Sequence, residues 1–390
     1  MKTMSLNGAS RTIAFFSLTL FISITVWASE GRYPIYEPTT ITSPGKYIVT
    51  RNITAAGIII NVQSSNVDID LNGFTLESTA PTDPVINVQG VSHVAIRNGI
   101  VSYGQNSIHV QGTIQVVIED IASYYANGAA ILMVDSSGDV RRCHIFSPYG
   151  EGIYFENYGA PGVFEDNVIE GTQSTGIRVV YGRGAVISGN RLISVSGNAI
   201  HLSGSTACLI SRNSIDDAYA DVIIRGIFVE NSMGITITGN CFYKMGSGIY
   251  LVSSTGCQLS ENTLSWADIE ISNSSGTQVF NNVIEGGWGN GIFLNANANH
   301  NRILNNVVSN RQGDGMIIGG KWNYIEGNLL NGNAYFGLNF TSFAQDNVYR
   351  GNMAHSNAGG GTCTNKVSND LCDDGSGDVS HGDNYMPGKL

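Results

Sequence analysis

Three side chains that could together remove a proton from a sugar acid follow one another in the middle of the chain: Tyr154, Arg178 and His201. They supply a phenol, a permanent cation and an imidazole. Arg178 would neutralise the carboxylate of a uronate and lower the barrier to removal of the proton at C5. His201 or Tyr154 would take this proton, and the other would donate one to the leaving glycosidic oxygen. The trio predicts β-elimination on an acidic polysaccharide.

Six further residues are predicted to bind the substrate beside this trio: His109, Gln111, Glu156, Phe228, Glu230 and Tyr250. The two aromatic rings offer faces for sugar stacking, and the two glutamates could contact hydroxyls or act as acid and base. The competing interpretation is an ordinary solvated sheet face, because exposed strands readily accept Tyr, Phe, Arg and His. In that interpretation Arg178 pairs with Glu156.

A returning asparagine indicates how these residues are positioned. It recurs every 20 to 27 residues, each time before a short apolar pair, at Asn167, Asn190, Asn213, Asn240, Asn262, Asn282, Asn306, Asn328 and Asn352. The register extends back through Asn98 and Asn72, with Asp120 and Cys143 in the same slot. Such a period indicates a stack of similar coils. The asparagine is expected to adopt left-handed backbone at a turn and to bond to its neighbours from coil to coil.

A second signature places a small residue before an apolar, variable, apolar triplet, as in Gly152-Ile153-Tyr154-Phe155. The two signatures predict two strands per coil, and helical spacing is absent. The middle residue of each triplet should face outward, in a column that begins Ile59, Asn87, His109, Leu132, Tyr154, Arg178, His201, Phe228, Tyr250, Glu270. At about 4.8 Å per coil, the trio spans about 10 Å.

These features resemble the right-handed parallel β-helix repeat superfamily, which includes pectate-lyase-like, alginate-lyase-like and NosD-like secreted proteins. The resemblance covers roughly residues 40 to 355. The segments Ile41–Ile53 and Val67–Leu76 look like the first coils of many secreted members. It implies an all-β fold, a single-stranded right-handed parallel β-helix (solenoid) of about 12 to 13 coils. It also favours a secreted carbohydrate-active enzyme, with a polysaccharide lyase as the leading hypothesis.

The predicted organisation is a signal peptide at 1–28, a β-helix domain at 29–358 and a capping tail at 359–390. Lys2 and Arg11 precede an apolar run from Ile13 to Trp27, which is shorter than the roughly 20 residues of a spanning helix. Secretion or a periplasmic location is therefore expected, with no membrane span after signal cleavage. Removal of two basic residues moves the net charge from −11 to −13, which argues against a nucleic-acid partner.

Register also constrains the cysteines. Cys208 and Cys257 each lie five residues before one of the recurring asparagines, which we call the ladder asparagines. The two cysteines should therefore point inward in one column about 9.6 Å apart, which is too far for a disulfide. Cys363 and Cys372 enclose a short polar loop and are predicted to be bonded, whereas Cys143 and Cys241 stay unassigned.

No cofactor is required by the predicted chemistry, although two acidic groups would allow Ca²⁺. One is the long coil with Asp216, Asp217 and Asp221, and the other is Asp373, Asp374 and Asp378, which lack full calcium-loop spacing. A solvated acidic loop is the simpler interpretation of the first group. Trp266, Trp288 and Trp322 fall near turns, where their rings could grip sugars or simply pack.

Other functions on the same scaffold stay open. The Gly-His-Gly pattern of polygalacturonase-like hydrolases and the Asp-Pro-His run of mannuronan epimerases are absent from the sequence. A uronate C5-epimerase of another kind shares the proton-abstraction step, and a glycoside hydrolase also remains an alternative. The hypothesis from a different class is a non-catalytic glycan-binding or envelope structural protein.

Overall fold

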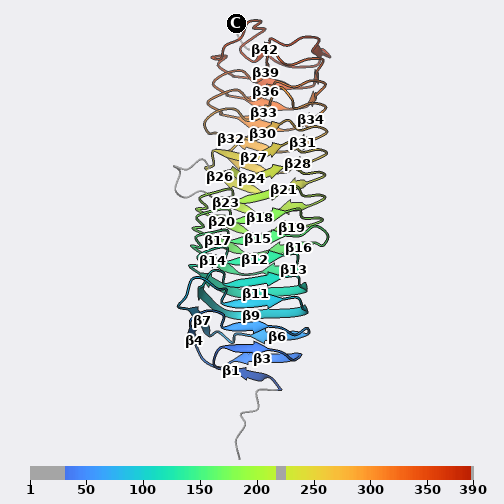
Figure 1. Cartoon of the computed structure of the whole chain (residues 1–390). Helices are drawn as coiled ribbons and strands as arrows, with labels where there is room; N and C mark the ends of the chain where they lie inside the picture. The colour runs from blue at the N-terminus through green and yellow to red at the C-terminus, as the bar shows by residue number, and fades with distance from the viewer. Residues whose placement is uncertain (1–30, 217–224, 388–390) are drawn as a thin grey trace, which may run out of the picture.

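A computed structural model describes residues 31–216 and 225–387, and in it the chain forms an elongated stack of coils (Figure 1). The described N-terminal and C-terminal residues lie at opposite ends of the stack. The expected signal peptide at 1–28, and Asp217 and Asp221 of the long coil, lie outside the described residues. No helix long and apolar enough to cross a membrane occurs within residues 31–216 and 225–387.

One face of the stack is a parallel sheet of 15 strands, which we call the front sheet. Its strands, in spatial order, are β2 (Thr39–Ile41), β5 (Ile60–Val62), β8 (Ile86–Gln89), β10 (Ile108–Gln111), β12 (Ile131–Val134), β15 (Ile153–Glu156), β18 (Ile177–Val180), β21 (Ile200–Ser203), β24 (Arg225–Glu230), β27 (Ser247–Val252), β30 (Ile269–Ser272), β33 (Ile292–Leu294), β36 (Met316–Ile318), β39 (Leu338–Phe340) and β42 (Leu371–Asp373).

The remaining 28 strands form one sheet that wraps around the other sides. They are β1 (Tyr33–Ile35), β3 (Gly45–Val49), β4 (Ile53–Ala55), β6 (Val67–Asp70), β7 (Thr75–Ser78), β9 (Ser92–Tyr103), β11 (Ile114–Tyr124), β13 (Gly138–Arg141), β14 (His144–Phe146), β16 (Gly162–Glu165), β17 (Val168–Glu170), β19 (Val186–Ser188), β20 (Arg191–Ile193), β22 (Leu209–Ser211), β23 (Ser214–Asp216), β25 (Thr236–Thr238), β26 (Cys241–Tyr243), β28 (Gln258–Ser260), β29 (Thr263–Ser265), β31 (Gln278–Phe280), β32 (Val283–Glu285), β34 (Arg302–Leu304), β35 (Val307–Ser309), β37 (Tyr324–Glu326), β38 (Leu329–Asn331), β40 (Val348–Arg350), β41 (Met353–His355) and β43 (Val379–Ser380).

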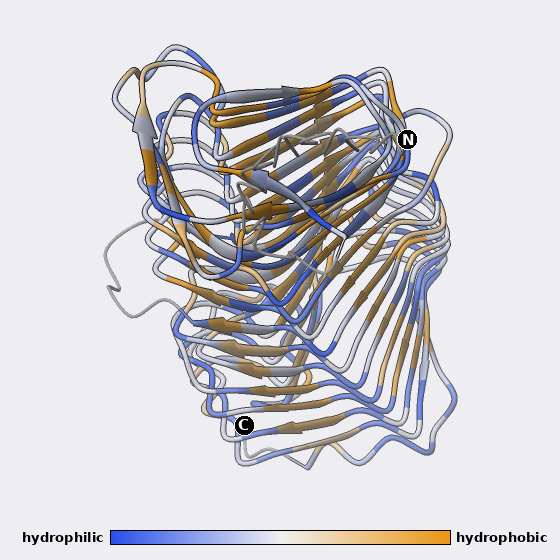
Figure 2. Cartoon of the chain, turned by 90° about the horizontal axis from the view of Figure 1, so that it is seen from below, coloured by the Kyte–Doolittle hydropathy of each residue, from blue (hydrophilic) through white to orange (hydrophobic). Residues whose placement is uncertain are grey.

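Alternation along each short strand fills the interior of the stack. In β15, Ile153 and Phe155 are fully buried, whereas Tyr154 and Glu156 are only half-buried and face the other way. Apolar strands repeat from coil to coil in Figure 2. The all-β parallel solenoid predicted from the sequence is confirmed, since each coil buries its apolar side against its neighbours.

Most coils contain three strands rather than the predicted two, because a corner divides the segment around each ladder asparagine. The left-handed conformation at this corner belongs to the preceding residue, as at Asp166 (φ 55°), Gly189 (φ 67°) and Arg212 (φ 54°). The expectation that the asparagine itself is left-handed is therefore wrong.

The register predicted for the early coils is wrong by one residue, because the left-handed position directly precedes the ladder position. Asn72, Asn98 and Asp120 have φ values of 53°, 61° and 54°, so they occupy the left-handed slot. The ladder position in the last two of these coils is occupied by the next residues, Gly99 and Ile121, which pair with each other. Cys143, by contrast, does lie in the ladder, because its N–H donates to Asn167 Oδ1 at 2.9 Å.

Hydrogen bonds between buried amides join the ladder from Asn167 to Asn352. In a typical step, Asn190 donates its backbone N–H (2.9 Å) and its Nδ2 (3.0 Å) to Asn213 Oδ1, and Nδ2 also donates to the Phe164 carbonyl at 2.8 Å. The predicted coil-to-coil bonding is confirmed. Every buried amide in such a step is paired, as buried polar groups require.

The C-terminal tail, predicted as a cap, adds a last coil to the stack. β42 pairs in parallel with β39, and β43 with β40. Three asparagine ladders end on acceptors from this tail: Asn352 donates to Asn384, Asn347 to Asp378 and Asn357 to Asp370. The tail thus supplies the acceptors that a further coil would have provided.

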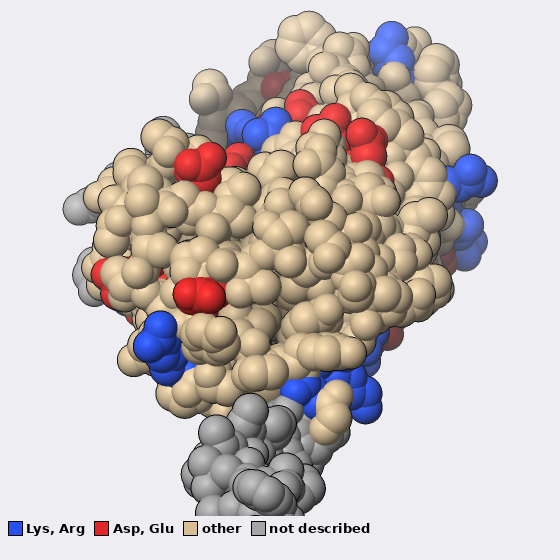
Figure 3. Space-filling view, turned by 60° about the horizontal axis from the view of Figure 1, so that its bottom comes forward, with Lys and Arg blue, Asp and Glu red and all other residues tan. Residues whose placement is uncertain are grey.

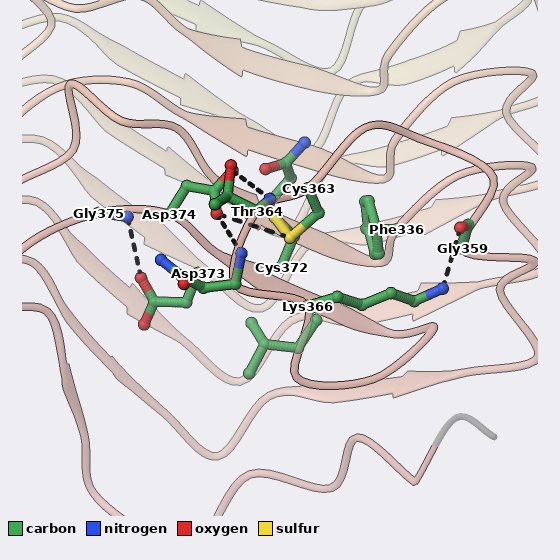
Figure 4. The surroundings of a disulfide bond; sticks show 12 residues. Phe336, Gly359, Cys363, Thr364, Lys366, Cys372, Asp373, Asp374 and Gly375 are labelled. Atoms are coloured by element: carbon green, nitrogen blue, oxygen red, sulfur yellow. Dashed lines mark hydrogen bonds between the residues drawn. A yellow bond between two sulfur atoms is a disulfide. The ribbon is translucent and has the colours of Figure 1, made fainter. Parts of the chain in front are cut away.

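The cysteine predictions are confirmed. Cys363 and Cys372 form a disulfide with Cα atoms 5.9 Å apart (Figure 4). Cys208 and Cys257 are buried free thiols. They share a column with Ile235 between them, since Leu209, Thr236 and Gln258 are successive partners one residue later. Cys143 is buried and free, and Cys241 is exposed and free.

Candidate functional site

The predicted trio does lie on three adjacent strands of the front sheet. Tyr154 in β15 is paired with Arg178 in β18, and Arg178 with His201 in β21. The column continues to Phe228 in β24 and Tyr250 in β27. We call these five residues the central column. Rungs about 4.8 Å apart place Tyr154 and His201 about 10 Å from each other along the stack.

His201 is held by contacts on two sides. Its Nε2 lies 3.1 Å from Glu230 Oε1, and its ring stacks on Phe228 with centroids 4.8 Å apart. Only 9% of the residue is exposed. Burial lowers the pKa of His201, the cations of Arg178 and Arg225 lower it further, and Glu230 opposes them. The neutral imidazole is therefore favoured, which is the form that accepts a proton.

Tyr154 donates its hydroxyl to Glu156 Oε2 at 2.7 Å. Burial and this hydrogen bond raise the pKa of Tyr154 to about 12. The phenol is therefore protonated at neutral pH. These protonation states are the ones required by the assignment in which His201 would be the base and Tyr154 the acid, one of the two left open by the sequence.

Arg178 contacts Glu151 rather than Glu156, which corrects the pairing considered from the sequence. Its Nη1 lies 3.5 Å from Glu151 Oε1, and its guanidinium carbon lies 5.6 Å from the centre of the Tyr154 ring. Glu151 was missed, because it precedes the triplet and belongs to neither outward column. The single contact at 3.5 Å leaves the two-pronged geometry of the guanidinium available to another carboxylate.

Arg225, which precedes the triplet in β24, lies over the last two residues of the central column, Phe228 and Tyr250. Its guanidinium carbon lies 4.6 Å from the centre of Phe228 and 4.3 Å from that of Tyr250. The two rings are themselves stacked, with centroids 5.5 Å apart. Two cations thus accompany an aromatic stack. Figure 3 shows, for one face of the molecule, that most of the surface is uncharged and that acidic and basic residues gather in a few places.

The other predicted contacts are more distant from the trio. His109 and Gln111 in β10 lie two rungs before Tyr154, with Leu132 of β12 between His109 and Tyr154. Glu156 and Glu230 occupy the same outward position three rungs apart, or about 14 Å. This separation exceeds the roughly 5 to 9.5 Å between the paired carboxyl groups of glycosidases. It argues against Glu156 and Glu230 as an acid and base pair.

One member of the predicted column is wrong. Asn61, not Ile59, pairs with Asn87, and Ile59 is fully buried. The run of three isoleucines at 58–60 obscured the register in this coil.

The acidic residues of the tail have structural partners. Asp374 accepts N–H groups from Thr364 and Asn365, as Figure 4 shows. Asp378 accepts from Asn347, and Asp373 accepts from Gly375. A cluster of Cys363, Cys372 and Asp374 atoms has metal-like proximity, but its two sulfurs form the disulfide. These carboxylates therefore accept hydrogen bonds at the end of an asparagine ladder and within turns of the tail.

The family described as "Right handed beta helix region" matches residues 84–224 and 225–371. No curated protein matches the sequence. Among solved structures, a mutant of the periplasmic alginate epimerase AlgG has 14% identity and a TM-score of 0.46, covering 88% of this chain and 79% of that one. PfbA, a surface adhesin of Streptococcus pneumoniae, has 14% identity and a TM-score of 0.45, covering 76% and 84%. The two family matches together span most of the sequence. The chain therefore belongs to the right-handed β-helix family.

Proposed function

We propose that the central column binds an acidic polysaccharide and cleaves it by β-elimination. The observation that carries this proposal is the position of His201, a mostly buried imidazole that contacts Glu230 and lies next to Arg178 in register. When Nε2 donates to Glu230, Nδ1 keeps its lone pair and can act as the base.

In the proposed reaction, Arg178 pairs with the uronate carboxylate and stabilises the charge that develops when the C5 proton leaves. His201 takes this proton. The electrons form the C4–C5 double bond, the C4–O bond breaks, and Tyr154 donates its proton to the departing oxygen. Glu156, which already accepts the Tyr154 hydroxyl, is placed to orient this donor. Phe228 and Tyr250 would contact neighbouring sugar rings through their outer edges, because Phe228 already stacks on His201 and on Tyr250.

A secreted or periplasmic location fits this substrate. The Cys363–Cys372 disulfide supports it, since such bonds persist in oxidising compartments.

The test is incubation of the mature protein with alginate, pectate and glycosaminoglycans, followed by ultraviolet absorbance of the unsaturated product. Arg178→Ala and His201→Ala should each lower kcat/KM by at least about a hundredfold. Ile317→Ala is the matched control, because Ile317 lies in the same outward column but far from the trio. Deuterium uptake at C5 without an unsaturated product would identify an epimerase instead.

The second candidate is a non-catalytic glycan-binding module. It is favoured by the existing Arg178–Glu151 contact and by the stacking of Arg225 on Phe228 and Tyr250, which form a binding surface without any need for a base. Failure to form product on every uronate, with glycan binding retained by both His201→Ala and Arg178→Ala, would reject the lyase in favour of this module.

A further inference from the structure

Two tryptophans on successive turns form an exposed aromatic pair beside the front sheet. Trp266 precedes β30 and Trp288 precedes β33, and they are 43% and 72% exposed. Their ring centroids lie 6.5 Å apart at an interplanar angle of 75°. Trp266 also has a φ of 59°, an unusual conformation for so bulky a residue. Large rings held in solvent in this way call for an explanation.

A buried cation holds both turns from the inside. Arg311 is only 2% exposed, and its guanidinium donates to the carbonyls of Ala267, Gly286, Trp288 and Asn290. The distances to Ala267, Trp288 and Asn290 are 3.0, 3.0 and 2.7 Å. Burial of a guanidinium is costly unless it is well bonded. Here its bonds join the two turns that carry the tryptophans.

Two glycines leave room for this arrangement. A Cβ on Gly286 would lie 3.1 Å from the Trp266 indole nitrogen, and one on Gly287 would lie 2.8 Å from Arg311 Nη1. Both glycines also have left-handed backbone, with φ values of 65° and 93°. The backbone under the tryptophan pair is therefore fixed by the buried Arg311 and by close packing rather than left free to adjust.

The turns that carry the pair lead directly into the front sheet, which also carries the central column. β30 and β33 carry Glu270 and Phe293, which continue this column after Tyr250. They are three and four rungs from His201, or about 14 and 19 Å. A polysaccharide that runs along the stack from His201 would reach the tryptophans only after several sugar units.

We propose that Trp266 and Trp288 form a stacking platform for pyranose rings of the acidic polysaccharide, several units away from the bond cleaved at His201. This inference rests on the proposed function for the identity of its ligand. The C–H face of a pyranose complements the electron-rich face of an indole. Because the turns are already ordered by Arg311, binding would cost little conformational entropy. Arg311 is in this view a positioning residue for the platform.

The test uses alginate or pectate oligosaccharides of three and of eight units, with Trp266→Ala, Trp288→Ala and the double variant. Trp322→Ala is the matched control, since Trp322 is also exposed (50%) and left-handed (φ 55°) but stacks on His300. Each single substitution should weaken binding of the longer oligosaccharide about two- to tenfold, as measured by calorimetry. The shorter oligosaccharide and Trp322→Ala should show no change. In an active enzyme, the loss should appear in KM for long chains with kcat unchanged.

Equal binding of the longer oligosaccharide by wild type and the double variant would overturn the platform. An equal loss for both chain lengths would also overturn it, because the effect would then arise at the central column. The same binding experiment in a His201→Ala background separates the two proposals. A chain-length-dependent loss in this background would keep the platform whether or not the wild type is an enzyme, whereas the absence of product from the wild type would reject only the lyase.

Discussion

Replacing Asn306 by alanine removes contacts that join three consecutive coils of the long ladder. Asn306 is fully buried, and its Nδ2 donates to the Val279 carbonyl at 2.9 Å and to Asn328 Oδ1 at 3.1 Å. Its Oδ1 accepts the backbone N–H of Asn282 at 3.0 Å and the Nδ2 of Asn282 at 2.9 Å. Alanine can replace none of these contacts.

The expected cost follows from the groups left behind. The Nδ2 of Asn282 keeps the carbonyls of Leu259 and Phe280 as acceptors, at 3.0 and 3.2 Å. The Asn282 backbone N–H and the Val279 carbonyl lose the Asn306 partner in a buried setting, and each such loss costs about 1 to 3 kcal/mol. With two such losses, the free energy of unfolding should fall by about 2 to 6 kcal/mol.

The adjacent residue is a matched control in the same coil. Asn305 is exposed and left-handed, with a φ of 53°, and the next two coils have Gly327 and Gly351 before their ladder asparagines. Asn305→Gly should therefore change stability by less than about 1 kcal/mol. Guanidinium unfolding followed by circular dichroism measures both variants, and native-state hydrogen exchange reports the Asn282 amide. Equal costs for the two variants, or unchanged exchange at Asn282 in Asn306→Ala, would refute the ladder reasoning.

Two further predictions concern titratable groups. Burial raises the pKa of Asp378, so its stabilising contribution is complete below the unfolded-state pKa and is lost as pH rises through the folded-state pKa. As the pH increases through this range, the Tm of the neutral Asp378→Asn variant should increase relative to that of the wild type. A Tm difference that does not vary with pH would contradict this. For His201, Glu230 opposes the pKa lowering caused by burial, so Glu230→Gln should lower the pKa further in an NMR titration, whereas the control Glu156→Gln should not. An unchanged or raised His201 pKa in Glu230→Gln would refute that electrostatic account.

The sequence alone determined the architecture and most of the register. An interior of stacked coils requires an apolar residue at the same position in every coil, so the period itself identifies which residues share a column. For this reason Tyr154, Arg178 and His201 were placed correctly on adjacent strands. The prediction failed at Ile59, where several apolar residues in succession left two registers equally plausible.

Only the tertiary structure decided what each outward side chain contacts. Arg178 pairs with Glu151, Tyr154 with Glu156 and His201 with Glu230. Long side chains can reach several neighbours on their own and on adjacent coils. Which partner each one contacts depends on rotamers and desolvation, which the sequence period does not encode. Arg311 illustrates the same limit, because four carbonyls from the turns of earlier coils converge on it only after the coils stack. Periodicity specifies the position of a residue on the solenoid, whereas its chemistry depends on neighbours from other coils.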